Sequence, residues 1–296
     1  MMKDESLRVS RHSSFIPHPS SFLLPRARTL TFGRIPLVMA IVNVTPDSFS
    51  DAGVHFDSGQ AIESALQMAE DGAAIIDIGG ESTRPGAVPI STAEEIGRVL
   101  PVIEGIRAKS DVAISIDTMK CDVARAALDG GADMINDVTA LRHDPRMREL
   151  AAQRNSPVIL MHTRGDPRTM QTMAKYDDVV WDVYRELRGF VDEAKHANVE
   201  QILVDPGIGF AKNFDHNVAL LARCSEFTSI APLVIGASRK KFIGHLTGRD
   251  AGPDRMPGSL AAVAAAVRGG ASIVRVHDVR ATVDFLKVFA AIEDAR

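Results

Sequence analysis

Eight short apolar runs recur along the chain, and nearly every one ends in a polar or charged residue. The runs are rich in Val, Ile and Leu and do not alternate polar with apolar positions. Strands with this pattern are buried on both faces, which is typical of a parallel sheet. The runs span residues 37–43, 73–84, 112–118, 133–137, 157–163, 201–207, 232–240 and 272–278.

Helical patterns separate these runs in strict alternation. Residues 61–72 carry one apolar stripe, and Ser91 with Glu94 fits a capping box that opens a helix toward Arg107. Further helices are expected at 119–129, 145–154, 177–197, 215–223, 258–269 and 280–294. This order favours a single α/β domain over residues 35–296, folded as a (β/α)8 TIM barrel. A doubly wound open sheet is the rival fold, because sequence spacing does not prove closure.

The first 34 residues differ from the rest in composition. They are rich in Ser, Arg and Pro and show no helical or strand period. They also lack the uninterrupted apolar core and the cleavage site of a secretory signal. We therefore expect residues 1–34 to be a disordered N-terminal extension or the product of a start codon assigned too early. An organelle transit peptide is the alternative, and Asp4 and Glu5 count against it.

The net charge and the cysteine content indicate which classes of partner and which cellular compartment to expect. The formal net charge of −4 gives no electrostatic reason to expect nucleic acid or an anionic membrane as the main partner. No apolar stretch reaches the roughly 20 residues that span a bilayer. Cys121 and Cys224 fit no metal spacing and are expected to be free thiols in a reducing compartment, which points to a cytoplasmic protein.

Four carboxylate or amide side chains lie in or directly after the apolar strands. They are Asp77, Asp117, Asn136 and Asp205. One buried Asp is often only a structural acceptor, but four such groups at one barrel mouth indicate a binding site, because burying an unpartnered carboxylate is costly. They suit a planar heterocycle with several N–H donors, although a sugar ring or a hard cation would also fit. A zinc site is not expected, because thiolates are absent from the set.

Two loops and one basic cluster complete the predicted mouth. Residues 44–58 are long for a βα connection, and Phe49 within them either packs on the rim or covers a substrate. The loop 79–87 brings Arg84, which either binds an anion or is simply exposed.

The cations Arg239, Lys240 and Arg275, with His277, follow the seventh and eighth strands, where barrels often bind phosphate. They predict a positive sector for a phosphorylated substrate. The alternative for Arg275 and His277 is an ion pair and a satisfied rim histidine.

These motifs together resemble those of dihydropteroate synthase, the pterin-binding enzyme of folate synthesis. The strings NVTPDSFSD, GGESTRPG, DPGIGFAK and SRKKFIG are the most specific of them. The resemblance covers about residues 37–280 and follows the order of the family. The matching segments are 41–53, 76–87, 114–118, 135–138, 160–171, 203–213, 236–244 and 274–279.

The resemblance implies a transferase that joins p-aminobenzoate to a pterin diphosphate and releases pyrophosphate, with sulfonamides acting as p-aminobenzoate mimics. It implies Mg²⁺ as cofactor, held with the help of Asn43, and a homodimer. The implied pterin-binding residues are Asp117, Asn136, Met161, Asp205 and Lys240. The implied pyrophosphate ligands are Asn43, Arg84, Arg275 and His277. The implied p-aminobenzoate pocket is Phe49, Thr83, Arg84, Pro85, Phe210, Ser238 and Lys240.

The catalytic roles implied by the resemblance are electrostatic. Lys240, Arg275 and His277 would serve the substrate anions, and Asp117 and Asp205 would favour an electron-poor pterin methylene, giving an S_N1-like course. Two other functions stay open: a methyltetrahydrofolate-binding methyltransferase domain and a non-catalytic pterin-binding homologue. The chain departs from the family at Ala52, Thr163 and Lys241, of which Thr163 leaves a ring contact in doubt.

Overall fold

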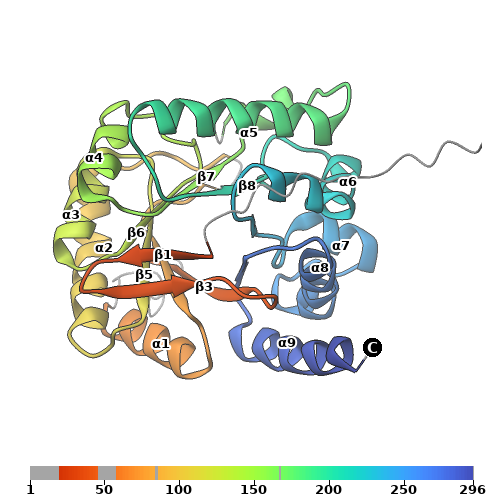
Figure 1. Ribbon diagram of the computed structural model, residues 1–296, viewed down its shortest axis with the longest axis horizontal. Coiled ribbons are helices and arrows are strands. Elements are labelled where there is room, and N and C mark those ends of the chain that lie inside the picture. The colour runs from red at the N-terminus through yellow and green to blue at the C-terminus, as the bar shows by residue number, and fades with distance from the viewer. Residues whose placement is uncertain (1–19, 46–57, 84–85, 167, 296) are drawn as a thin grey trace, which may run out of the picture.

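The computed structural model describes residues 20–45, 58–83, 86–166 and 168–295. Eight parallel strands form one sheet in the order β8-β7-β6-β5-β4-β3-β10-β9. A parallel bridge between Val204 and Leu233 joins the two edges, and the Val204 amide donates to the Pro232 carbonyl at 3.1 Å. The helices surround the strands (Figure 1), so the fold is the expected TIM barrel. The strands are β3 (Leu37–Asn43), β4 (Ile75–Gly79), β5 (Ala113–Asp117), β6 (Met134–Asp137), β7 (Val158–Met161), β8 (Ile202–Asp205), β9 (Val234–Ile235) and β10 (Ile273–Val276).

Nine α-helices occur in the described part of the chain, one more than expected. They are α1 (Ser58–Glu70), α2 (Thr92–Arg107), α3 (Cys121–Gly130), α4 (Arg146–Arg154), α5 (Val179–His196), α6 (Phe214–Ala222), α7 (Lys241–Thr247), α8 (Met256–Arg268) and α9 (Val279–Asp294). The extra helix is α7, which has only seven residues and therefore too few turns to show a period. The Ser91 half of the predicted capping box is confirmed, because its side chain accepts the Glu94 amide, whereas the Glu94 carboxylate binds Arg98 Nη2 at 2.6 Å.

The barrel interior divides the strands into two ends with different contents. At the amino ends, apolar side chains such as Met39, Ile75, Met134 and Leu203 are buried in one cluster. The larger cluster lies between the outer faces of the strands and the helices. Within the barrel strands, the polar residues lie from the middle of each strand to its carboxyl end, so the fold leaves that end of the barrel for chemistry.

A β-hairpin precedes the barrel and corrects the prediction for residues 1–34. Strands β1 (Ser21–Leu24) and β2 (Arg28–Thr31) pair in antiparallel fashion. Phe22, Leu24 and Leu30 are buried in the same apolar cluster as the amino ends of the barrel strands. The expectation of disorder is therefore wrong for residues 21–31, and the predicted boundary at residue 35 separates a packed element from its barrel. Residues 1–19 lie outside the described part.

The sequence pattern does not predict the hairpin, for two physical reasons. Each strand has only four residues, too few to establish an alternating pattern. The turn places Arg26 and Ala27 at φ of 62° and 55°, a left-handed conformation that Gly and Asn normally mark in a sequence. The turn is held instead by charge, because Arg26, Arg28 and Arg107 all pair with the fully buried Asp133.

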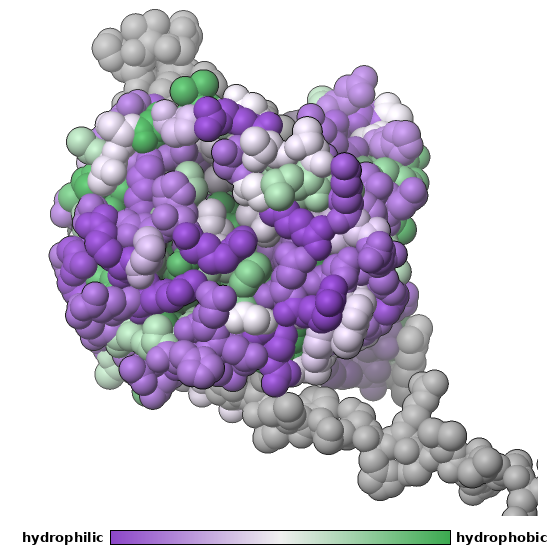
Figure 2. Space-filling view, turned by 90° about the horizontal axis from the view of Figure 1, so that it is seen from above, coloured by the Kyte–Doolittle hydropathy of each residue, from purple (hydrophilic) through white to green (hydrophobic). Residues whose placement is uncertain are grey.

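Among the described residues, no helix is long and apolar enough to cross a membrane. The face shown in Figure 2 is mostly hydrophilic, with small separated hydrophobic areas.

Candidate active site

The predicted site residues gather at the carboxyl ends of the strands. Strand pairing puts Asn43 beside Gly79, Gly79 beside Asp117, and Asp117 beside Asn136, so these positions form one row around the mouth. Met161 and Asp205 end β7 and β8 and are also partners across the ladder. Ser238 and Lys240 follow β9, and Arg275 and His277 lie in and just after β10. The topology thus brings together residues spread over more than two hundred positions of sequence.

Arg275 is the centre of a charge network across the mouth. Its Nε donates to Asp77 Oδ2 at 2.6 Å, and its Nη2 donates to Asp117 Oδ2 at 2.8 Å. Burial by itself lowers the pKa of Arg275, but Asp77 and Asp117 outweigh it and raise that pKa. The ion pair considered as an alternative for Arg275 is therefore present, and Nη1 is the guanidinium nitrogen that these two bonds leave for a ligand.

Asp77 is the site residue whose role the sequence missed. It lies in the middle of β4, is fully buried, and accepts a second bond from Asn136 Nδ2 at 3.0 Å. Its Oδ1 has no hydrogen-bond partner among the described residues. Asp77 thus orients both Asn136 and Arg275. The available signal was an acidic residue inside the otherwise apolar string IIDIG, which indicates a buried partner.

Two of the aspartates at strand ends, Asp117 and Asp205, have pKa values raised by burial. The pKa of Asp117 is raised to about 7, mainly by burial. Arg275 opposes this rise, and the Asp77 carboxylate adds to it. Burial also raises the pKa of Asp205, against the hydrogen bond that the Gly207 amide donates to Oδ1 at 2.7 Å. The protonation of these acids therefore responds to whatever cation or electron-poor group lies beside them.

His277 enters the site as a neutral imidazole. Burial, then Arg239 and Arg275, lowers its pKa to about 4. Its Nδ1 lies 3.1 Å from Ser238 Oγ, which already accepts the His277 amide at 3.2 Å. The hydroxyl proton is therefore available for Nδ1, which places the imidazole proton on Nε2. His277 can donate one hydrogen bond to an anion but adds no charge.

The predicted positive sector is smaller than expected. Arg239 pairs with Asp278 through Nε at 3.0 Å and through a second contact from Nη2, so its charge is balanced within the protein. Arg239 therefore adds little to the predicted positive sector. Lys240 is placed at the mouth, with Nζ 4.3 Å above the centre of the Phe210 ring. A side chain at Gly209 would come within 3.0 Å of Lys240 Cδ, so that glycine admits the lysine stem.

The structure describes only some of the remaining predicted site residues. Phe49, Arg84 and Pro85 lie outside the described residues. Thr83 is half-buried in the loop after β4, and Asn43 is half-buried at the end of β3. Within the described ranges, no group of three or more His, Cys, Asp or Glu side chains could hold a metal ion. The amide oxygen of Asn43 still suits Mg²⁺, which commonly takes one or two protein oxygens together with substrate phosphates and waters.

Comparison with known proteins decides the family. The model of the pterin-binding enzyme family matches residues 39–277. The Synechocystis dihydropteroate synthase is 44% identical over 289 residues, covering 96% of this chain and 99% of the relative. The chain belongs to the dihydropteroate synthase family of pterin-binding enzymes.

Two solved members of the dihydropteroate synthase family have the same fold. The Xanthomonas albilineans enzyme with 4-aminobenzoic acid is 46% identical, with a TM-score of 0.85, and covers 90% of this chain and 96% of that chain. The Yersinia pestis enzyme in complex with a sulfonamide drug is 41% identical, with a TM-score of 0.85, and covers 94% of this chain and all of that chain. The family that the motifs resemble is therefore confirmed.

Proposed function

We propose that this chain condenses 6-hydroxymethyl-7,8-dihydropterin diphosphate with p-aminobenzoate to give 7,8-dihydropteroate and pyrophosphate. The observation that carries the proposal is the network in which Arg275 joins Asp77 and Asp117 beside Asn136 at the barrel mouth. A pterin ring carries several N–H donors and ring acceptors in one plane. Carboxylates and an amide held in one row match that pattern.

The pterin would lie over Asp117, Asn136 and Asp205, with Met161 and Lys240 beside it. Asn136 donates its Nδ2 hydrogen to Asp77, so its carbonyl oxygen is the end left to accept from the ring. The carboxylates of Asp117 and Asp205 accept ring N–H groups. They also stabilise positive charge that develops on the adjacent methylene carbon.

The reaction we propose is S_N1-like. The methylene C–O bond breaks with its electron pair on the departing diphosphate, and the amine lone pair of p-aminobenzoate then forms the C–N bond. The amine loses one proton after that step, so no enzyme nucleophile is needed. Both cysteines are buried and neither is placed at a strand end.

The departing diphosphate would be bound by Nη1 of Arg275, by the Nε2–H of His277 and by Asn43. Arg84, in the part of the loop outside the described residues, is proposed for the same anion. Mg²⁺, held by Asn43 and the diphosphate oxygens, would supply charge neutralisation of the leaving group.

The p-aminobenzoate is proposed to bind between Lys240, Phe210, Ser238 and Thr83, with Phe49, Arg84 and Pro85 completing the pocket. Lys240 Nζ lies above the Phe210 ring. The ammonium offers a cation for the substrate carboxylate, and the Phe210 side chain offers an apolar surface for the substrate ring. Sulfonamides, which share the shape of the acid, are proposed to compete for this pocket.

We also propose a cytoplasmic homodimer. The two buried free thiols fit a reducing compartment. Exposed apolar side chains at Leu246, Val288 and Ile292 supply surface for a partner copy. Light scattering after size exclusion would test the assembly, and a monomer at micromolar concentration would contradict it.

The deciding assay is pyrophosphate release that requires both p-aminobenzoate and the pterin diphosphate. EDTA is expected to stop the release and added Mg²⁺ to restore it. Lys240→Ala is expected to lower kcat/KM by at least about a hundredfold, because it removes a charge-assisted contact made by a half-buried ammonium. Methyl transfer from a folate, or pterin binding without turnover, would replace the proposal with one of the two alternative functions.

A further inference from the structure

The loop between β8 and α6 carries Phe210, the ring beneath Lys240. This loop is pressed against the end of β7: a Cβ atom at Gly207 would lie 2.0 Å from the His162 carbonyl oxygen. Gly207 also has a φ of 71°, so both space and backbone require glycine there. The position of Phe210 therefore depends on how this loop is fixed to the β7 end.

Lys212 makes that fixing contact from inside the protein. Its side chain is buried, with only 3% of the residue exposed. Its Nζ donates to the Phe210 carbonyl at 2.8 Å and contacts the His162 carbonyl at 3.4 Å and His162 Nδ1 at 3.0 Å. An ammonium has three donors, and all three are directed at these acceptors.

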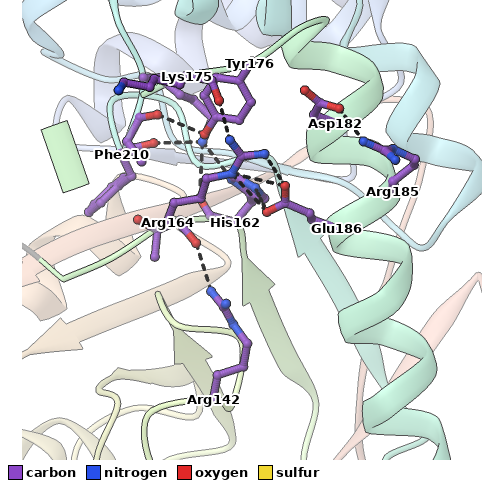
Figure 3. A network of polar contacts seen from close by, with 12 residues as sticks. Arg142, His162, Arg164, Lys175, Tyr176, Asp182, Arg185, Glu186 and Phe210 are labelled. Carbon is purple, nitrogen blue, oxygen red and sulfur yellow. Dashed lines mark hydrogen bonds and ion pairs between the residues drawn. The ribbon is translucent and has the colours of Figure 1, made fainter. Parts of the chain in front are cut away.

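His162 continues the contact to a carboxylate. Burial and Lys212 lower its pKa to about 3, so the ring is neutral. Because Nδ1 accepts from Lys212, the ring proton is on Nε2, which lies 3.0 Å from Glu186 Oε2 on α5. Arg164 Nε binds the same carboxylate at 3.1 Å, and Arg164 lies over the Tyr176 ring at 4.1 Å (Figure 3).

The geometry points to Lys212 as a positioning residue that sets the Phe210–Lys240 pair and thereby the binding of the aromatic amine, with His162 and Glu186 holding Lys212 in place. The identity of the amine as p-aminobenzoate rests on the proposed function. The fixing of the loop does not, because it depends only on the contacts of Lys212.

A packing role alone does not account for a cation at this position. A methionine would fill a similar space, whereas burying an ammonium is unfavourable because the charge loses its hydration. That cost is visible in the pKa of Lys212, which burial lowers to about 7 although Asp205 and Glu186 raise it. A methionine could not replace the hydrogen bonds that Nζ makes with the two carbonyl oxygens that fix the loop.

The test compares Lys212→Met and Glu186→Gln with Glu193→Gln. Glu193 is a matched control, because it also lies on α5 and pairs with an arginine, Arg148, at 2.6 Å, but its side chain is 55% exposed. We expect the KM for p-aminobenzoate to rise about tenfold in Lys212→Met and about threefold in Glu186→Gln. The KM for the pterin diphosphate should stay within about twofold of wild type, and the control should match wild type.

Hydrogen exchange of amides 207–213 gives a readout that needs no turnover. Exchange there should rise about tenfold in Lys212→Met and not in Glu193→Gln. Unchanged exchange, or both KM values rising together, would overturn the inference. A wild type without synthase activity would refute the proposed function, and the exchange data would then decide the loop contact alone. If Lys212→Met does not fold, Glu186→Gln carries the same two measurements.

Discussion

The hairpin before the barrel should contribute measurable stability without touching catalysis. Phe22 is 2% exposed, belongs to the cluster at the amino ends of the strands, and meets the Phe32 ring edge-on at 5.1 Å. Truncating a buried Phe to Ala typically costs about 3–5 kcal/mol. For a chain of this size, about 1 kcal/mol corresponds to roughly 2–4 °C in Tm, so Phe22→Ala should lower Tm by about 6–20 °C.

The adjacent residue provides the control. Leu23 lies in the same strand, faces outward and is 65% exposed, so Leu23→Ala should change Tm by no more than about 2 °C. Tm is measured by calorimetry at one scan rate, and kcat/KM is measured well below both midpoints. Equal Tm values for the two variants would refute the assignment of the hairpin to the core. A selective loss of kcat/KM in Phe22→Ala would refute the separation of the two barrel ends.

Three further predictions concern the charge network. Asp77→Asn should lower kcat/KM about 10- to 100-fold, because a charged hydrogen bond of about 1.5–3 kcal/mol to Arg275 is lost; Asp129→Asn, on an exposed ion pair, should behave as wild type, and parity between the two would contradict the role of Asp77. Since burial raises the pKa of Asp117 to about 7, kcat/KM for the pterin diphosphate should climb as pH rises through 7 and then level off; a flat wild-type profile from pH 5 to 8 would remove Asp117 as the titrating group. Burial lowers the pKa of His277 from 6.5 to about 4, so as pH falls the unfolded chain binds the proton first, and folding stability is lost between pH 6.5 and 4. Urea unfolding should show that His277→Gln reduces this loss by about 3 kcal/mol. An identical pH dependence of stability in both proteins would contradict this role of His277.

The barrel could be predicted from the sequence because parallel strands buried on both faces require continuous apolar runs. Runs without polar alternation, separated by helices with a clear period, predicted all eight barrel strands and eight of the helices. The shortest elements contain too few residues to show a recognisable pattern. The helix α7 is too short to show a period, and the hairpin turn uses Arg26 and Ala27 where a glycine would have marked it.

For the site, the sequence predicted which positions meet but not how their charges are shared. Asp117, Asn136 and Asp205 were expected at the mouth because strand ends converge there. The pairing of Arg275 with Asp77, and of Arg239 with Asp278, depends on side-chain directions across the barrel, which no local pattern encodes. The same holds for Lys212, whose acceptors are carbonyl groups of the backbone.

The hairpin also constrains the order in which the chain can fold. Its Leu23 amide donates to the Gln201 side chain at 2.7 Å, and Gln201 returns a bond to the Leu23 carbonyl at 3.0 Å, across 178 positions of sequence. During synthesis the hairpin emerges before every barrel strand, yet this pair of bonds requires Gln201, which directly precedes β8, the sixth barrel strand along the chain. Until Gln201 has been made, the Leu23 backbone lacks these two bonds, and contacts so distant in sequence form slowly. A hairpin made before the barrel thus gains this contact only after five of the eight barrel strands have been made.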